Sequence, residues 1–289
     1  MLEVNKTTFV YKSHSPDQTD VTALHGVDFA ALKGEFIAVL GRNGSGKSTF
    51  ARLLNALLLP SEGSVIVKGM DTRDEKNIWE IRRTAGMVFQ NPDNQIVGTT
   101  VEEDVAFGPE NLGIEPSEIR IRVDGALDLT DMTDYAGHSP HLLSGGQKQK
   151  VAIAGILAMK PECIILDEAS SMLDPSGRRE LMQILRKLNT EEKITIIHIT
   201  HNMDEAKKAD RIIVMDNGAV VLQGTPAEVF SNVEMMKGLG LDVPQVTELF
   251  YELNKEGLDL PNDVLSVDEA FEAICGMAAK PYSIRGGEK

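Results

Sequence analysis

Cysteine is scarce in this sequence, which has only Cys163 and Cys275 among its 289 residues. Their spacing fits no metal-ligand motif, which argues against a cysteine-ligated metal site. Cys163 lies inside an apolar, strand-like run, so we expect a reduced thiol in the core and no redox role.

Basic residues are also few, with 29 Lys and Arg against 44 Asp and Glu, for a net charge of −15. This balance argues against a broad footprint on the phosphate backbone of DNA or RNA. A strong negative charge favours solubility and suits a basic protein partner. We therefore expect no nucleic-acid partner.

Long hydrophobic runs are absent, and no apolar stretch approaches the roughly eighteen residues of a membrane-spanning helix. The first residues have neither a basic start nor an apolar segment typical of a signal peptide. Hydrophobic content is 42% and charged content 25%, both ordinary for a globular protein. We expect a cytosolic chain whose contact with any membrane comes through a partner.

A glycine-rich motif stands between an apolar run and a helical pattern. It reads Gly41, Arg42, Asn43, Gly44, Ser45, Gly46, Lys47, Ser48, Thr49 and fits the phosphate-binding P-loop. Backbone N–H groups of such a loop and of the following helix surround phosphates. Lys47 is then placed to reach the β- and γ-phosphates, and Ser48 to offer its hydroxyl to Mg²⁺. The alternative is a glycine turn with a solvated lysine. The motif predicts that the chain binds ATP with Mg²⁺.

Two carboxylates, Asp167 and Glu168, follow the apolar run Cys163–Leu166. A continuous apolar run is typical of a buried parallel strand, and ligands bind at the carboxyl ends of such strands. We expect Asp167 to hold Mg²⁺ and Glu168 to act as the general base on the attacking water. The alternative is a strand-end turn with two solvated acids.

The order of patterns predicts an α/β core interrupted by a helical insert. We expect strands at residues 2–11, 27–40, 64–68, 84–90, 163–166, 195–200 and 211–215. Helical patterns cover residues 75–83, 99–106, 116–128, 145–159 and 175–189, and then 244–255 and 267–277. The predicted units are a nucleotide-binding domain at residues 1–225, with a helical subdomain at about 91–160, and a C-terminal helical extension at 226–289.

A third motif lies twenty residues before the acidic pair and reads Leu143, Ser144, Gly145, Gly146, Gln147. With this motif the chain resembles the ATP-binding cassette (ABC) family over about residues 2–230. The resemblance implies a RecA-like P-loop core, an antiparallel β subdomain and a helical insert. It also implies that this signature binds the γ-phosphate held by the P-loop of a second subunit. Read alone, Ser-Gly-Gly is a common loop and helix cap.

Smaller motifs follow in the order of the family. The resemblance implies that Gln90 contacts Mg²⁺, that Asp174 belongs to the D-loop and that His201 contacts the γ-phosphate. It also implies that Tyr11 stacks on adenine. A lone histidine is often structural, and His198 is a nearby alternative. An aromatic residue that ends a first strand is commonly part of the core.

Within this family the chain is similar to the ATPases of energy-coupling factor (ECF) transporters, most of all to the first of their two paralogous ATP-binding subunits. Residues 89–111 carry this resemblance, together with the tail segments 244–247 and 258–261. Gly155 also fits that group, since most importer cassettes have Arg at this position. The tail is too short for the β-barrel regulatory domain of sugar-importer ATPases.

The resemblance implies a peripheral protein on the cytoplasmic face of the cell membrane. Its partners would be a second ATP-binding subunit, a membrane scaffold and substrate-capture subunits for vitamins or transition-metal ions. In such transporters, arginine-bearing scaffold helices reach the region after Gln90. We therefore expect the acidic cluster Asp93, Glu102, Glu103, Asp104 to contact the scaffold. The alternative is a solvated acidic helix start, which the helix dipole favours.

Three other function classes are less consistent with the residues. A DNA-repair or chromosome-maintenance ATPase would need coiled-coil insertions or basic surfaces, and a translation-factor cassette would normally carry two P-loops. A sensor that does not hydrolyse ATP would not need both Glu168 and His201. The sequence names neither the transported substrate nor the composition of the ATPase pair.

Overall fold

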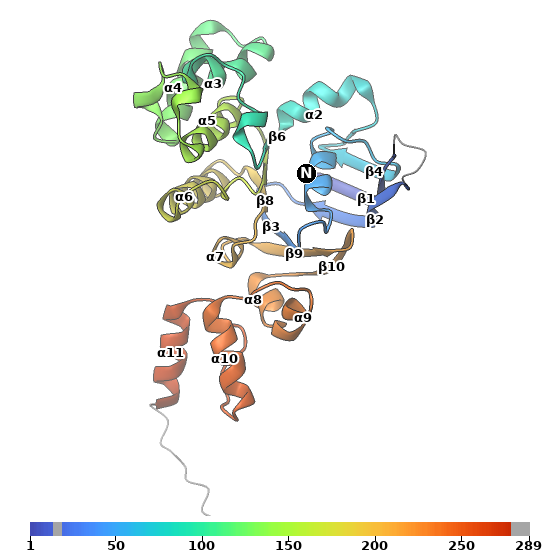
Figure 1. The fold of residues 1–289 in the computed structure, drawn as a ribbon, viewed down its shortest axis with the longest axis vertical. Coiled ribbons are helices and arrows are strands. Elements are labelled where there is room, and N and C mark those ends of the chain that lie inside the picture. The colour runs from blue at the N-terminus through green and yellow to red at the C-terminus, as the bar shows by residue number, and fades with distance from the viewer. Residues whose placement is uncertain (14–18, 279–289) are drawn as a thin grey trace, which may run out of the picture.

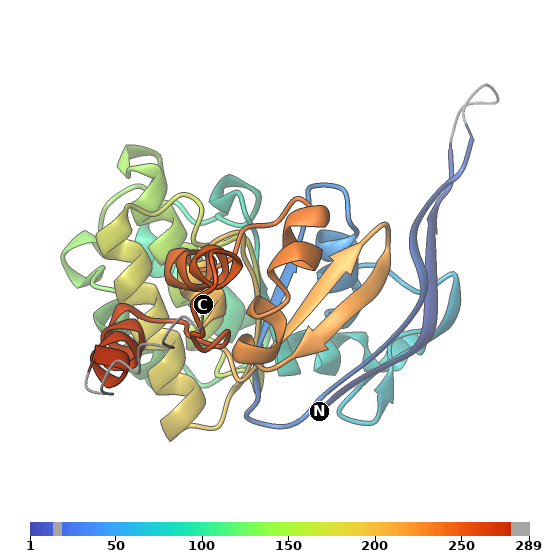
Figure 2. The ribbon, with the colours of Figure 1, turned by 90° about the horizontal axis from the view of Figure 1, so that it is seen from below.

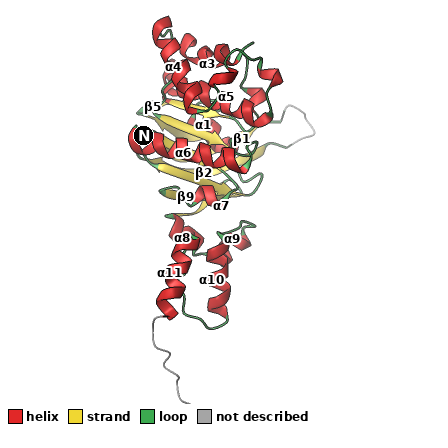
Figure 3. Cartoon of the chain, turned by 90° about the vertical axis from the view of Figure 1, so that its left-hand side faces the viewer, coloured by secondary structure: helices red, strands yellow, loops and turns green. Residues whose placement is uncertain are grey.

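The structure, a computed structural model, describes residues 1–13 and 19–278 of the chain. Two β-sheets form the middle of the molecule (Figure 1). A group of helices covers one end, and two further helices extend from the opposite end (Figure 3). Within the described residues, no helix is both long and apolar enough to cross a membrane.

The larger sheet has six strands in the order β10-β9-β3-β8-β7-β6. These are β3 (Phe36–Gly41), β6 (Ala85–Val88), β7 (Cys163–Asp167), β8 (Thr195–Ile199), β9 (Arg211–Asp216) and β10 (Ala219–Gly224). β10 pairs antiparallel with β9, while every other neighbouring pair is parallel. The apolar runs of β3, β7 and β8 are buried throughout, as expected for strands covered on both faces.

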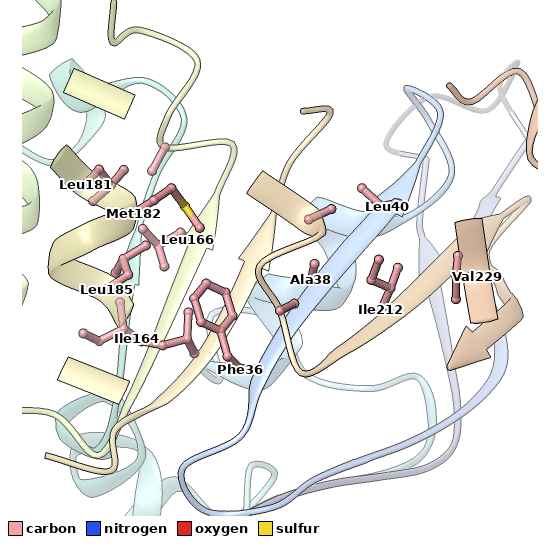
Figure 4. Packing of buried hydrophobic residues seen from close by; sticks show 14 of the residues in the cluster. Phe36, Ala38, Leu40, Ile164, Leu166, Leu181, Met182, Leu185, Ile212 and Val229 are labelled. Atoms are coloured by element: carbon pink, nitrogen blue, oxygen red, sulfur yellow. The ribbon is translucent and has the colours of Figure 1, made fainter. Parts of the chain in front are cut away.

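Alternate residues of these strands enter two different hydrophobic clusters. On one face, Phe36, Ile164 and Leu166 pack with the helix α6 (Pro175–Glu191) through residues such as Leu185 (Figure 4). On the other face lie α1 (Lys47–Leu54), α2 (Ile78–Thr84) and the second sheet. Because successive residues of β3 and β7 pack into opposite clusters, both strands are held between two layers of hydrophobic side chains.

The second sheet is antiparallel, with the order β2-β1-β4-β5. Its strands are β1 (Leu2–Tyr11), β2 (Val21–Ala31), β4 (Glu62–Val67) and β5 (Met70–Asp71), and the β1–β2 hairpin projects far from the body (Figure 2). The single strand predicted at 27–40 is wrong, because a turn separates β2 from β3. Gly34 takes a φ of 74° there, and the Leu32 N–H donates to the Glu35 carboxylate at 2.9 Å. We also expect from the sequence a polar loop between the first two strands, at residues 13–20, and most of it lies outside the described residues.

The helical insert consists of α3 (Val101–Asn111), α4 (Pro116–Leu129) and α5 (Gly145–Ala158). It has a hydrophobic cluster of its own, which includes Val105, Leu127 and Val151. α3 and α5 each begin with a capping box, from Thr100 with Glu103 and from Ser144 with Gln147. Single 3₁₀ turns are η1 (Glu75–Asn77), η2 (Pro92–Asn94), η3 (Thr133–Tyr135) and η4 (Pro140–Leu142).

Up to residue 278, where the described residues end, four helices follow the core sheet: α8 (Pro226–Phe230), α9 (Val233–Gly238), α10 (Gln245–Lys255) and α11 (Val267–Ala278). α8 and α9 pack on the large sheet through Phe230 and Met236. α10 and α11 share a separate small cluster around Phe250 and extend away from the core (Figure 1). The predicted boundary at residue 225 stays a prediction, and residues 279–289 of the extension lie outside the described residues.

Candidate nucleotide-binding and catalytic site

The P-loop connects the end of β3 to the start of α1, as its sequence predicts. Lys47 folds back over the loop, and its Nζ donates to the carbonyls of Gly41 at 2.7 Å and Arg42 at 2.9 Å. Gly46 precedes the helix with a φ of 100°, in a region where a side chain would be strained. The loop is therefore curved around the Lys47 ammonium group.

Lys47 is only 4% exposed. Burial lowers the pKa of its ammonium group, and the nearby charges of Glu168 and Asp167 act in the opposite direction. A bound phosphate would add further negative charge beside the ammonium and favour its charged form. This lysine is thus placed to stabilise negative charge in the P-loop.

Asp167 ends β7 and is 4% exposed. Burial raises the pKa of its carboxyl group, partly opposed by the Ser48 hydroxyl, which donates to Oδ1 at 2.9 Å. A hydroxyl and a carboxylate that meet beside a phosphate loop are oxygen ligands of the kind that Mg²⁺ prefers. Among the residues that the structure describes, no group of three or more His, Cys, Asp or Glu side chains could hold a metal.

Glu168 is the point where three segments meet. Its Oε2 accepts from Gln90 Nε2 at 2.7 Å, and its Oε1 lies 2.5 Å from His201 Nε2. The backbone of Glu168 takes a φ of 52°, and strain of this kind is common at functional sites. The Glu168 side chain is 16% exposed and that of His201 is 42% exposed, so a ligand can reach both.

The two histidines considered from the sequence lie in different surroundings. His198 is fully buried in β8 and pairs with Glu205, whereas His201 follows the strand and faces Glu168. The structure therefore brings His201 to the candidate site and leaves His198 in the core.

A cavity of about 550 Å³ joins the P-loop to Gln90 and Glu168. Tyr11 lines it from the end of β1, with its hydroxyl 3.1 Å from the Thr49 hydroxyl. The sequence motifs did not point to six further lining residues on β2 and at the β9–β10 turn: Val21, Thr22, Ala23, His25, Asn217, Gly218. Only the Asn-Gly pair offered a signal, since it predicts a tight hairpin turn.

The signature motif lies outside this cavity, at the start of α5. Ser144, Gly145 and Gly146 are at least partly exposed, whereas Leu143 is buried in the helical cluster. Leu143 therefore anchors the loop from inside. Asp174, the expected D-loop residue, caps α6 by accepting the Gly177 N–H at 2.9 Å.

The four acidic residues after Gln90 do not form one surface. Asp104 is only 8% exposed, and its Oδ1 accepts the N–H groups of Val97 and Gly98 at 2.7 and 2.8 Å. The expectation that Asp104 contacts a scaffold is therefore corrected to a role in holding the preceding loop. Asp93 pairs with Lys148 at 2.7 Å and Glu102 with Arg120 at 2.9 Å. Glu103 completes the cap of α3.

Comparison with known proteins identifies the family of the chain. Residues 24–171 match the profile of the ABC transporter family. The chain is 61% identical, over 92% of its length and 95% of the relative, to the energy-coupling factor transporter ATP-binding protein EcfA1 of Clostridium novyi. It is 58% identical to the protein of the same name in Clostridium perfringens, over 95% of this chain and 98% of that protein.

This chain belongs to the energy-coupling factor transporter ATP-binding proteins. It is thus an ATPase of the ABC type, and the sequence-based assignment to the first of the two paralogous subunits is confirmed. The predicted α/β fold class is also confirmed.

Two solved structures have the same fold. CbiO1 from Clostridium perfringens, described as part of the ABC transporter complex cbiONQ, has a TM-score of 0.71 at 39% identity and covers 86% of this chain and 98% of its own. The cassette MJ0796, a dimer bound to ADP and Pi, has a TM-score of 0.72 at 33% identity over 78% of this chain and 98% of its own.

Proposed function

We propose that this ATPase binds Mg-ATP in the cavity beside the P-loop, with Glu168 as its catalytic base. One observation carries the proposal: the Glu168 carboxylate lies within hydrogen-bonding distance of both Gln90 and His201 at the edge of the cavity that Lys47 also lines. A base that is positioned by two neighbours can take a proton from a water molecule held beside the γ-phosphate.

The residues of the site have separate tasks in this scheme. P-loop N–H groups and Lys47 bind the β- and γ-phosphates. Tyr11 stacks on the adenine ring of ATP. Ser48, Asp167 and Gln90 would hold Mg²⁺, whose chemical contribution is to neutralise charge that develops on the phosphates. His201, next to Glu168, contacts the γ-phosphate. Glu168 orients the water and accepts its proton.

A second ATP-binding subunit is needed to complete the site. Within the described chain, none of the residues that line the P-loop cavity belongs to the signature 143–147. The exposed N–H groups at the start of α5 are suited to binding an anion, and in the ABC family this anion is the γ-phosphate of the opposite subunit. We therefore propose a two-fold or pseudo-two-fold pair with ATP at the interface.

A groove between the core and the helical insert is a suitable place for a membrane scaffold. It has a volume of about 370 Å³, and its lining includes Trp79, Val97 and Phe107, which are 70%, 63% and 52% exposed. Exposed apolar side chains that gather in one groove commonly mark a protein contact. Gln95, close after Gln90 in the chain, also lines it.

We place the chain as a peripheral subunit on the cytoplasmic face of the membrane. The groove would receive scaffold helices, and the scaffold would carry substrate-capture subunits for vitamins or transition-metal ions. Three observations support this arrangement: the family of the chain, the apolar groove, and the acidic residues Asp93 and Glu102 on the same insert.

The test compares the variants Glu168→Gln and Lys47→Ala in the assembled transporter. We expect Glu168→Gln to bind Mg-ATP normally and to lose about 10²- to 10⁴-fold in turnover, the usual contribution of a positioned base. Lys47→Ala should weaken ATP binding itself. Light scattering of Glu168→Gln should also show pairs that form on addition of Mg-ATP.

Glu191→Gln, at the exposed end of α6, is the matched control and should behave like the wild type. Wild-type turnover in Glu168→Gln would exclude Glu168 as the base. Absence of Mg-ATP-dependent pairing between ATP-binding subunits, within an otherwise intact complex, would exclude the paired site.

A further inference from the structure

Glu205 is a buried carboxylate on the short helix α7 (Met203–Ala206), outside the residues proposed to contact ATP. It is 3% exposed. A single oxygen, Oε2, lies 2.9 Å from Ser170 Oγ, 2.8 Å from His198 Nε2 and 2.5 Å from Thr200 Oγ1. Three side chains thus converge on one atom of the core.

These contacts come from the two loops that carry the proposed catalytic residues. Ser170 follows Glu168 by two positions, and Thr200 directly precedes His201. The same Thr200 hydroxyl accepts the Asn202 N–H at 3.0 Å, so the chain is fixed on both sides of His201. Glu205 therefore joins the loop after β7 to the loop after β8.

The environment keeps this carboxylate ionised. Burial raises the pKa of Glu205, but the hydrogen bonds from His198, Thr200 and Ser170 outweigh burial and lower the pKa below its ordinary value. Even so, Glu205 Oε1 and His198 Nδ1 are buried without a hydrogen-bond partner in the part of the chain that the structure describes. A core optimised for stability alone would favour apolar side chains here.

We propose that Glu205 is a positioning residue, which holds the loops of Glu168 and His201 in the arrangement that ATP hydrolysis requires. The inference rests on the roles proposed above for these two residues. Its physical basis is that the hydrogen bond between Glu168 and His201 depends on the relative position of two loops. Displacement of a catalytic group by about 1 Å can cost roughly 10²-fold in rate.

The decisive experiment uses two threonines with equal burial. Thr200 is 2% exposed and donates to Glu205, whereas Thr130 is 3% exposed and donates to the Ala126 carbonyl in the helical insert at 2.9 Å. Thr200→Val and Thr130→Val both remove a buried hydroxyl while they keep the shape of the side chain. A purely structural role predicts the same outcome for both variants.

We expect Thr200→Val to lower kcat by about 10- to 100-fold with the KM for ATP changed less than about 2-fold, because the P-loop is untouched. Thr130→Val should lower the melting temperature to a similar extent and keep the wild-type kcat. Ser170→Ala should resemble Thr200→Val, and the double variant should lose less than the product of the two single effects, since both bonds end on Glu205.

Glu205→Gln and Glu205→Ala complete the series, because Gln keeps an acceptor oxygen and should retain more turnover than Ala. Wild-type kcat in both Ser170→Ala and Thr200→Val would overturn the proposal. So would a loss of kcat that only follows the fraction of unfolded protein. Normal turnover in Glu168→Gln would reject Glu168 as the base but leave the Glu205 result to be judged on these variants.

Discussion

At the scale of single residues, burial decides which charges of the site are available for chemistry. Lys47 and Asp167 are both 4% exposed, and burial shifts the pKa of each toward the neutral form. Such groups gain most from a ligand that brings opposite charge or a cation into the cavity. Glu168 and His201 are more exposed than these two groups, so water and a ligand can reach them.

The two cysteines provide a test, at the scale of single residues, of how burial changes the reactivity of a side chain. Burial raises the pKa of the Cys163 thiol to about 12, while Cys275 is exposed. At pH 8 a thiol-reactive disulfide should modify one cysteine in the folded protein and both in denaturant, because the thiolate is the reacting form. Prompt reaction of two thiols in the folded protein would contradict the buried position of Cys163.

The same shift gives a pH dependence with a definite sign. Above about pH 8.5 the unfolded chain loses the Cys163 proton while the folded chain keeps it. The free energy of unfolding should therefore fall as pH rises toward the folded-state pKa of about 12. Cys163→Ala should flatten this slope relative to the wild type in urea titrations.

At the scale of elements, one turn connects three parts of the nucleotide site. Gly218, in the β9–β10 turn, donates its N–H to the Ser45 carbonyl at 3.0 Å, and its carbonyl accepts the His25 N–H at 2.9 Å. The core sheet, the P-loop and the antiparallel sheet thus meet at a single glycine. The position tolerates no larger residue, because a Cβ there would lie 2.6 Å from the Ala23 oxygen.

A matched pair of glycines tests this connection. Gly218 has a φ of 75° and Gly69 one of 80°, but a Cβ at Gly69 would meet no atom within 4 Å. Both Gly→Ala variants carry a cost of about 1 kcal/mol for left-handed backbone. Gly218→Ala alone should also displace β2 from the P-loop and weaken ATP binding by roughly 10-fold or more.

Calorimetric titration with ATP and a melting curve of each variant distinguish the two effects. Equal ATP affinity in Gly218→Ala and Gly69→Ala would show that the turn does not position the nucleotide site.

At the scale of the whole molecule, the insert connects the site to the proposed scaffold. The groove of Trp79, Val97 and Phe107 also contacts Gln95, which donates to the Ala152 carbonyl of α5 at 2.8 Å. α5 in turn begins at the signature. A partner in the groove would therefore contact the helical insert, which also carries the signature.

If the scaffold docks on the helical insert, substitutions of its acidic residues should have distinct effects. Asp93→Arg and Glu102→Arg should release the scaffold, or uncouple uptake from hydrolysis, while ATP binding stays normal. Removal of a buried, hydrogen-bonded charge partner costs about 2–5 kcal/mol, whereas a pair at the rim mainly changes the salt dependence. Trp79→Ala should weaken docking independently of charge.

Pull-down of the scaffold and substrate uptake measure these outcomes. Glu272→Arg, on α11, is the matched control, because Glu272 is exposed. Glu269 on the same helix is less suitable, because its carboxylate accepts the N–H groups of Leu265 and Ser266 and so caps the helix. Normal uptake in Asp93→Arg, Glu102→Arg and Trp79→Ala would leave the acids as a solvated helix start.

The sequence by itself determined the P-loop, the acidic pair after β7 and the signature, because each depends on residues adjacent in the chain. Apolar runs likewise predicted β3, β7 and β8, since strands buried on both faces need continuous hydrophobic residues. The sequence did not separate β2 from β3, where a short turn interrupts one apolar pattern.

Only the tertiary structure decided what lies together from distant segments. Gln90 and His201 meet Glu168 because β6, β7 and β8 are neighbours in one sheet. The burial of Asp104, the cluster around Glu205 and the contacts of Gly218 depend on packing between elements, which no local pattern encodes. The chemistry of the chain is thus local in sequence, while the positions that this chemistry requires are set by the sheet and its neighbours.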